Sequence, residues 1–265
     1  MTERLHRQDP LIPEEREEFE EDLVSFCDRE LDLLGEIGGL NVLYAGGSSL
    51  LWIEGLSQRA GEGGTVTALD LDRERAEATG ENLESADLRA PARLVVGSVF
   101  GPPFDPGTFD LVYSAGLFHE LDVSRRTAED ALLALASVVR PGGRLATGDF
   151  VDTVPAVQLE DERLDAELAH LASGSEPFGI GSPGRLVGLH ERVLSDVRWR
   201  VSAPHVIRHM DRIVLAEEEP AAFAALPRGT GERLRGRREA LRERVRREGY
   251  TRPATLYVEG RVRGG

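Results

Sequence analysis

The sequence predicts an α/β fold, in which a doubly wound, mostly parallel sheet of seven strands carries helices on both faces. Two observations support this prediction. Short apolar runs alternate with stretches of helical periodicity through residues 40–150. Glycines and prolines separate the two kinds of segment. Such alternation is typical of parallel strands that are joined by right-handed helical crossovers.

In the core, the apolar runs predict strands at residues 41–45, 65–69, 92–96, 109–115 and 144–148. The segments between them predict helices that reach residue 59, cover 73–85 and cover 128–139. Arg140-Pro-Gly-Gly143 is expected to stop the last of these helices. The core therefore reads as repeated strand–helix units.

The flanking segments have other patterns. Residues 14–35 predict one helix, whose apolar face includes Cys27, so this single cysteine is expected to be a buried thiol. Beyond residue 150 we expect a helix at 157–172, a mobile lid at 174–184, an extended region at 197–215, a helical stretch at 220–248 and a last strand at 254–262. The predicted units are an N-terminal extension (1–39), the core (40–150), a cap insertion (151–196) and the C-terminal part of the same domain (197–265).

Charge and hydropathy restrict the partners. The net charge is −15, which disfavours a nucleic-acid partner because such binding depends on basic side chains. No apolar run is long enough for a membrane span, and the first residues are polar, so a cytoplasmic protein is expected. Charge is uneven: residues 13–36 are strongly acidic, whereas 228–247 hold nine Arg against three Glu. These two segments either pair with each other, or 228–247 is a solvated helix or an anion-binding surface.

Ligands of open α/β sheets bind beyond the carboxyl ends of the strands. After the first strand, Gly46-Gly47 lets the backbone approach a ligand, and the next helix offers free N–H groups to an anion. Asp70 follows the second strand, where a carboxylate accepts hydrogen bonds from the ribose of an adenosine-containing cofactor. Two alternatives stay open, namely Asp72 in that role and Asp70 as a helix cap. The Gly-x-Gly-x-x-Gly motif of dinucleotide-binding oxidoreductases is absent from residues 46–51.

Several segments occur in a characteristic order: Val42-Leu43…Gly46, Val66-Thr-Ala-Leu-Asp70, Phe109-Asp-Leu-Val112 and Val139-Arg-Pro-Gly-Gly143. This stretch resembles the Rossmann-like class I S-adenosylmethionine-dependent methyltransferase family. Through Leu117-Phe-His119-Glu-Leu it is most similar to the ubiquinone/menaquinone methyltransferase branch. The resemblance implies S-adenosylmethionine as cofactor and methyl transfer to a small-molecule acceptor.

The resemblance also implies a set of cofactor-binding residues: Tyr44, Gly46, Gly47, Ser48, Asp70, Leu71, Ser98, Val99 and Ser114. Three of them depart from the family pattern, one of which is Ser48 in place of a glycine. Tyr44 replaces an acid that helps to hold the ammonium group of the cofactor, and Ser98 replaces an Asp at the adenine. These departures leave a second hypothesis open, a non-catalytic or regulatory protein with a degenerate cofactor motif.

His119 is the predicted general base, with a packed histidine at the start of a short helix as the alternative. Phe178, in the Gly- and Pro-rich loop, and His190 are the predicted acceptor-binding residues, while His205 and His209 are weaker candidates. No metal-ligand spacing is present. The expected partners are the small-molecule acceptor and a second copy of the chain in a homodimer.

Overall fold

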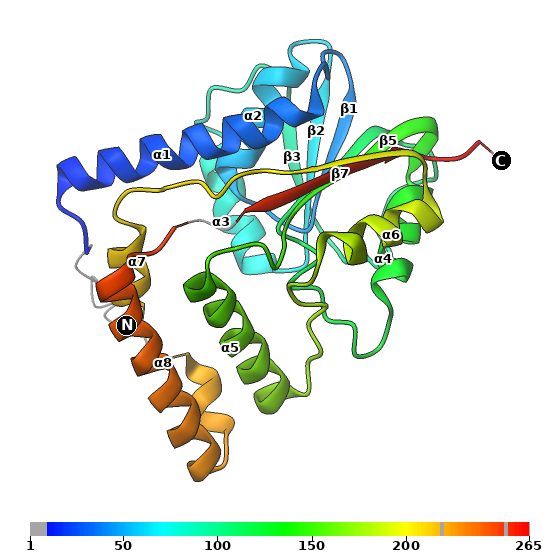
Figure 1. Cartoon of the computed structure of the whole chain (residues 1–265). Helices are drawn as coiled ribbons and strands as arrows, with labels where there is room; N and C mark the ends of the chain where they lie inside the picture. The colour runs from blue at the N-terminus through cyan, green and yellow to red at the C-terminus, as the bar shows by residue number, and fades with distance from the viewer. Residues whose placement is uncertain (1–9, 218–219, 252–253, 265) are drawn as a thin grey trace, which may run out of the picture.

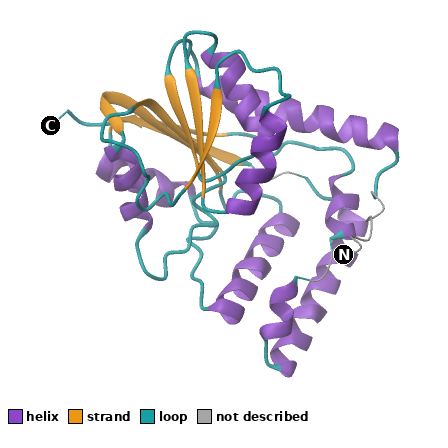
Figure 2. Ribbon diagram, turned by 180° about the vertical axis from the view of Figure 1, so that it is seen from behind, coloured by secondary structure: helices purple, strands orange, loops and turns teal. Residues whose placement is uncertain are grey.

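The computed structural model describes residues 10–217, 220–251 and 254–264. Its centre is a twisted sheet in the order β3-β2-β1-β4-β5-β7-β6 (Figures 1 and 2). The strands are β1 (Asn41–Ala45), β2 (Thr65–Asp70), β3 (Ala92–Val96), β4 (Phe109–Ala115), β5 (Val139–Phe150), β6 (Ser195–Val201) and β7 (Thr255–Arg261). β7 is antiparallel to both neighbours and the other pairs are parallel. The predicted seven-stranded, doubly wound sheet is confirmed.

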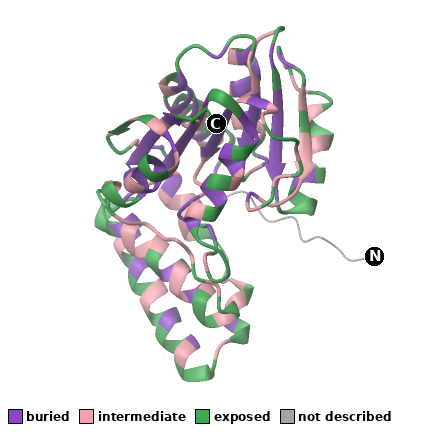
Figure 3. Cartoon of the chain, turned by 90° about the vertical axis from the view of Figure 1, so that its right-hand side faces the viewer, coloured by how far each residue is buried: buried purple, intermediate pink, exposed green. Residues whose placement is uncertain are grey.

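Two layers of helices cover the sheet. On one face lie α1 (Pro13–Leu31), α2 (Leu50–Ala60) and α3 (Arg73–Leu83), and on the other lie α4 (Ala128–Ser137) and α6 (Pro183–Val193). Alternate residues of β1 separate the two cores, since Val42 and Tyr44 face α1 and α2 whereas Leu43 faces α4. Figure 3 shows the buried residues concentrated in the strands.

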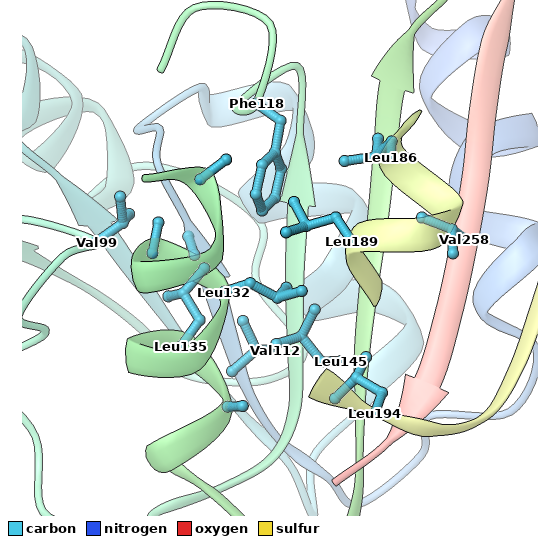
Figure 4. Close-up of a cluster of buried hydrophobic side chains, with 14 of the residues drawn as sticks. Val99, Val112, Phe118, Leu132, Leu135, Leu145, Leu186, Leu189, Leu194 and Val258 are labelled. Atoms are coloured by element: carbon cyan, nitrogen blue, oxygen red, sulfur yellow. The ribbon is translucent and has the colours of Figure 1, made fainter. Parts of the chain in front are cut away.

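The core on the α4 and α6 side is large and well filled. Figure 4 shows Phe118, Leu132 and Leu189 pointing into the space between these two helices and the sheet. The strand order reverses between β1 and β4, because the chain runs outward to β3 before it returns to β4. This switch point leaves a crevice at the carboxyl ends of β1 and β4, where ligands of such sheets bind.

A helical region projects from one end of the sheet (Figure 1). It contains α5 (Ala156–Ser173), α7 (Met210–Ala216), a short 3₁₀ helix (Ala221–Ala225) and α8 (Arg228–Glu248). α5 and α8 lie side by side around a shared apolar cluster. No helix in the described ranges is both long and apolar enough to cross a membrane.

No described residue of the Arg-rich helix α8 pairs with the acidic helix α1, so the first of the expected arrangements is wrong. Its arginines meet acids of α5 instead, with Arg233 2.8 Å from Glu167 and Arg244 3.2 Å from Glu160. The acids of α1 are matched by a different basic residue, Arg208, whose Nε lies 2.9 Å from Asp22. Both charged segments therefore find partners within the fold.

The extended region predicted at 197–215 is only partly correct. β6 ends at Val201, and Met210–Ala216 forms α7. Met210, Ile213 and Val214 recur at helical spacing and pack against the start of α1. Tertiary packing has overridden the strand preference of the β-branched residues here.

Two other boundaries differ from the sequence prediction. α4 ends at Ser137, and β5 already begins at Val139, so Arg140–Gly143 opens a strand instead of separating it from the helix. α6 was not predicted. It lies in the α4 layer, whereas α5 packs on α8, so the two helices of the predicted cap (151–196) lie in different parts of the molecule. The division into units stays a prediction.

Candidate functional site

The turn after β1 needs glycine at its first position. Gly46 has a φ of +86°, and the Leu117 side chain packs where a Cβ would lie. The N–H groups of Gly46 and Gly47 both donate to the carbonyl of Leu69, at 2.8 and 3.1 Å. The turn therefore fixes the path of the backbone and does not offer these two amides to a ligand.

Asp70, at the carboxyl end of β2, is a buried carboxylate with 6% exposure. One of its oxygens accepts a hydrogen bond from the Ser48 hydroxyl at 2.6 Å, and the other accepts from the Asp72 N–H at 2.9 Å. The cap of α3 is Asp72, which accepts from the Arg75 N–H at 3.1 Å. The alternatives from the sequence are thus separated: Asp72 is the helix cap, and Asp70 stays turned toward the switch point.

The neighbourhood of Asp70 combines a positive helix end with an apolar surface. The Ser49 side chain does not cap α2, and the first turn of that helix contains no acid. Its free N–H groups and helix dipole favour an anion such as a carboxylate. Next to Asp70, the Leu71 side chain is 74% exposed. These features fit an adenosine cofactor that itself carries a carboxylate. Asp70 can accept from the ribose hydroxyls, the end of α2 can bind the cofactor's carboxylate, and Leu71 offers an exposed apolar side chain.

Three other residues of the predicted cofactor site are engaged within the protein. Tyr44 is buried, and its ring stacks on Trp52 and on Tyr113, each at 6.4 Å between centroids. The Ser98 hydroxyl accepts from the Phe100 N–H at 3.2 Å within its own turn. Val99 packs into the core cluster on the α4 side. Tyr44 therefore does not replace the charge of the missing acid.

Ser114 and His190 lie together, but inside the protein. The Ser114 hydroxyl donates to Thr147 at 3.2 Å, Thr147 bonds His190 Nε2 at 3.0 Å, and His190 Nδ1 donates to the Leu186 carbonyl at 2.9 Å. Burial lowers the pKa of His190 to about 4, so the ring is neutral. Ser114 is 1% exposed and His190 is 0% exposed. β4 turns Ser114 toward α6, the helix that carries His190, and the ligand-binding roles of both residues stay predictions from the sequence.

His119 and Asp149 form a hydrogen-bonded pair of ionisable side chains at this end of the sheet. The Nδ1 atom of His119 lies 2.8 Å from an oxygen of Asp149, and the His119 ring packs on Phe150 with 4.7 Å between centroids. Asp149 is 1% exposed and also accepts backbone N–H bonds from Phe118 at 2.6 Å and Phe150 at 2.7 Å. Because a carboxylate only accepts, the His119 proton lies on Nδ1 and leaves Nε2 as the basic atom.

Two further acids face this free nitrogen. Glu120 and Glu162 lie 3.6 and 3.8 Å from His119 Nε2. Burial opposes the charged ring, but the hydrogen bond and charge of Asp149 and the charges of Glu162 and Glu120 outweigh it and raise the pKa of His119. Burial also raises the pKa of Glu162 to about 7. Glu162 therefore titrates near neutral pH beside His119.

Glu162→Gln is expected to change how stability depends on pH. In the folded protein the pKa of Glu162 rises from 4.5 to about 7, so its contribution is fully present below pH 4.5 and is lost as the pH rises through 7. Glutamine does not titrate, so this loss of stability is absent from the variant. The difference in free energy of unfolding between variant and wild type should therefore shift in favour of the variant by about 2 kcal/mol as the pH rises from about 5 to about 8. Chemical denaturation across this range measures the effect. Glu81→Gln on exposed α3 is the matched control, and equal pH profiles for all three proteins would contradict the assignment.

Phe178 and His119 line one small cavity together with Asp149, Phe150 and Arg185. The predicted lid (174–184) is hydrogen-bonded to the segment after β4, since the Phe178 N–H donates to the Leu121 carbonyl at 2.8 Å and Gly179 donates to His119 at 2.9 Å. The structure thus brings the predicted base and the predicted aromatic contact together. The mobility of the loop stays a prediction.

The weaker histidine candidates lie elsewhere. His209 Nε2 is 2.8 Å from Glu18, and His205 Nε2 is 3.2 Å from the Asp22 carbonyl, so both are held against α1. Within the described ranges, no group of three or more His, Cys, Asp or Glu side chains is arranged to hold a metal ion.

Sequence reasoning missed Asp149 and Glu162. Asp149 lies at the carboxyl end of β5, so the rule that was applied to the first four strands would have found it if it had been extended to the fifth. Glu162 gave no such signal. It is one of several acids on α5, and only the packing of that helix brings it to His119.

Comparison with known proteins agrees with this geometry. Residues 43–147 match the family model described as a methyltransferase domain. The fold is similar to that of YcgJ from Bacillus subtilis, with a TM-score of 0.59, 13% identity and coverage of 91% of this chain and 100% of that one.

Two further structures share the fold. One is a SAM-dependent methyltransferase from Aquifex aeolicus, with a TM-score of 0.50, 21% identity and coverage of 76% and 94%. The other is geranyl diphosphate methyltransferase in complex with SAM, with a TM-score of 0.53, 17% identity and coverage of 90% and 85%. The domain match and the shared fold support S-adenosylmethionine as the cofactor. Residues 43–147 are therefore similar to a methyltransferase domain, in a chain that shares its Rossmann-like fold with solved methyltransferase structures.

Proposed function

We propose that this protein transfers the methyl group of S-adenosylmethionine to a small-molecule acceptor, with His119 as the general base. The observation that carries the proposal is the position of Asp70, the uncapped end of α2 and the His119–Asp149 pair at one end of one sheet. Asp70 would hold the ribose, with Ser48 beside it. The N-terminus of α2 would bind the carboxylate of the cofactor.

The bound cofactor would supply an electrophilic methyl group on its sulfonium. The protein would align the acceptor and, where the acceptor must lose a proton, accept that proton at His119 Nε2. Asp149 would hold the ring in the required tautomer and stabilise its charged form. Glu162 could then take the proton onward, since its pKa of about 7 is close to neutral pH.

The charge distribution favours a small molecule over RNA or DNA as acceptor. Part of the positive charge of α8, the most basic segment, is neutralised by acids of α5, which pair with Arg233, Arg237, Arg238 and Arg244, and this leaves less charge for phosphates. The net charge of −15 repels a polyanion. Membership of the ubiquinone/menaquinone branch, a cytoplasmic location and a homodimer stay predictions from the sequence.

Calorimetry with S-adenosylmethionine and S-adenosylhomocysteine tests the cofactor. Saturable heat is expected with both, and at about 100 times Kd the protein should gain about 2.7 kcal/mol of stability. The absence of both effects would contradict the proposal and favour a non-catalytic protein. Transfer of a labelled methyl group into low-molecular-mass, RNA and protein fractions of a cell extract then tests the acceptor class. Label in the RNA or protein fraction alone would contradict a small-molecule acceptor.

A further inference from the structure

A small cavity of about 40 Å³ lies beside the proposed transfer site, at the carboxyl ends of β4 and β5 and under α1 and α2. One water needs roughly 10–15 Å³ of such space, so the cavity can hold a head group of a few heavy atoms. Gly148 borders this space. A Cβ there would lie 3.2 Å from the Tyr113 hydroxyl and 3.5 Å from a carboxylate oxygen of Glu30, so the missing side chain leaves room between these two polar groups.

The lining of the cavity combines aromatic rings with one acid. Phe26, Trp52, Tyr113 and Phe150 come from four different elements, and the Trp52 and Tyr113 rings are 5.7 Å apart. Glu30 is only 4% exposed, and it accepts a hydrogen bond from the Thr255 hydroxyl at 2.8 Å. Aromatic faces and a buried carboxylate both attract a cation.

The Tyr113 hydroxyl gives an independent indication of a ligand. It is fully buried, and no group of the described residues hydrogen-bonds to it. Buried hydroxyls in native proteins almost always have a partner, so one without any points to a missing ligand or water. This hydroxyl also borders the open space at Gly148.

We propose that this cavity binds the ammonium group of a small molecule, with Glu30 as the counter-charge, the rings around it and the Tyr113 oxygen as a hydrogen-bond acceptor. In the context of the proposed function, on which this assignment rests, the acceptor is then an amine. Most of the cavity lining comes from β4, β5 and β7, on the far side of β1 from Asp70, which favours the acceptor as the source of the ammonium group. The ammonium group could instead belong to the cofactor. In that case Glu30 would take the role of the family's acid, which is replaced by Tyr44 in this sequence.

Dimethylammonium chloride is a suitable probe, and Trp52 is a built-in reporter. The chain has two tryptophans, so Trp199→Phe on exposed β6 leaves Trp52 alone. A saturable change in Trp52 fluorescence is expected with dimethylammonium but not with ethanol or sodium chloride. Glu30→Gln should weaken the affinity about tenfold or more, whereas Glu17→Gln, which removes an exposed charge from the same helix, should leave it unchanged.

Tyr113→Phe covers the case in which Glu30→Gln does not fold. It removes a hydroxyl that has no hydrogen-bond partner among the described residues, so the midpoint of thermal unfolding should not fall, while the probe affinity drops about threefold. No saturable response, an equal response to ethanol, or equal affinities in Glu30→Gln and Glu17→Gln would overturn the proposal.

Repeating the titration with saturating S-adenosylhomocysteine separates the two sources. Independent binding supports the amine of the acceptor, and competition supports the ammonium group of the cofactor. If S-adenosylhomocysteine does not bind while the probe still does, the proposed function fails and the ammonium site stands. If the cofactor binds and the probe does not, only the ammonium site fails.

Discussion

Asp149→Ala is expected to lower the free energy of unfolding by about 3–5 kcal/mol, the range for breaking a buried, hydrogen-bonded ion pair. The carboxylate accepts from three backbone N–H groups, those of Phe118, His119 and Phe150, and from the His119 ring. Alanine leaves all four donors without this partner at a site with 1% exposure. Urea denaturation of the wild type and the variant measures the difference.

Asp152→Ala is the matched control, because Asp152 is an exposed acid three residues along the same segment. Its effect should stay within about 0.5 kcal/mol. A loss of less than about 1 kcal/mol in Asp149→Ala would show that water or neighbouring groups replace the carboxylate, and that Asp149 does not organise the site.

Asp70→Asn is expected to weaken the binding of S-adenosylmethionine about 30- to 150-fold, or about 2–3 kcal/mol, because hydrogen bonds to a charged acceptor are lost. Asparagine keeps the shape of the side chain. Its oxygen can accept from the Asp72 N–H while the Ser48 hydroxyl turns to accept from its NH2 group, so the fold should persist. Calorimetric titration of the folded variant measures the affinity.

Asp72→Asn separates this role from a general effect of charge. It removes the same charge two residues away, and asparagine still caps α3. Its affinity for the cofactor should therefore stay within about threefold of wild type. Equal losses in both variants would mean that the field of the acidic turn, and not a contact of Asp70, holds the cofactor.

The order of elements in the core was predictable because each β–α unit carries its own local signal. The ranges predicted for β1, β3 and β4 match the structure, and α1 and α5 differ from it by a few residues at most. The predictions were least accurate where long-range packing competes with local preference. α7 is helical although it is rich in β-branched residues, because Met210, Ile213 and Val214 pack against α1.

The candidate site divides in the same way. The position of a residue directly after a strand was enough to identify Gly46, Asp70 and His119, since parallel strands bring their carboxyl ends to one edge of the sheet. The sequence could not tell which way the neighbouring side chains turn. Ser114 and His190 point inward, while Glu30 and Tyr113, which carried no motif, border a cavity.

The sequence by itself thus determined the succession of strands and helices along the core and the edge at which the site lies, because both follow from short periodic patterns and turns. Only the tertiary structure decided the chemistry at that edge. Glu162 of α5 lies close to His119, and Glu30 of α1 lines the same cavity as Tyr113, although both helices are distant in sequence from these partners. Such contacts depend on how helices pack on a sheet, and no local pattern encodes that packing.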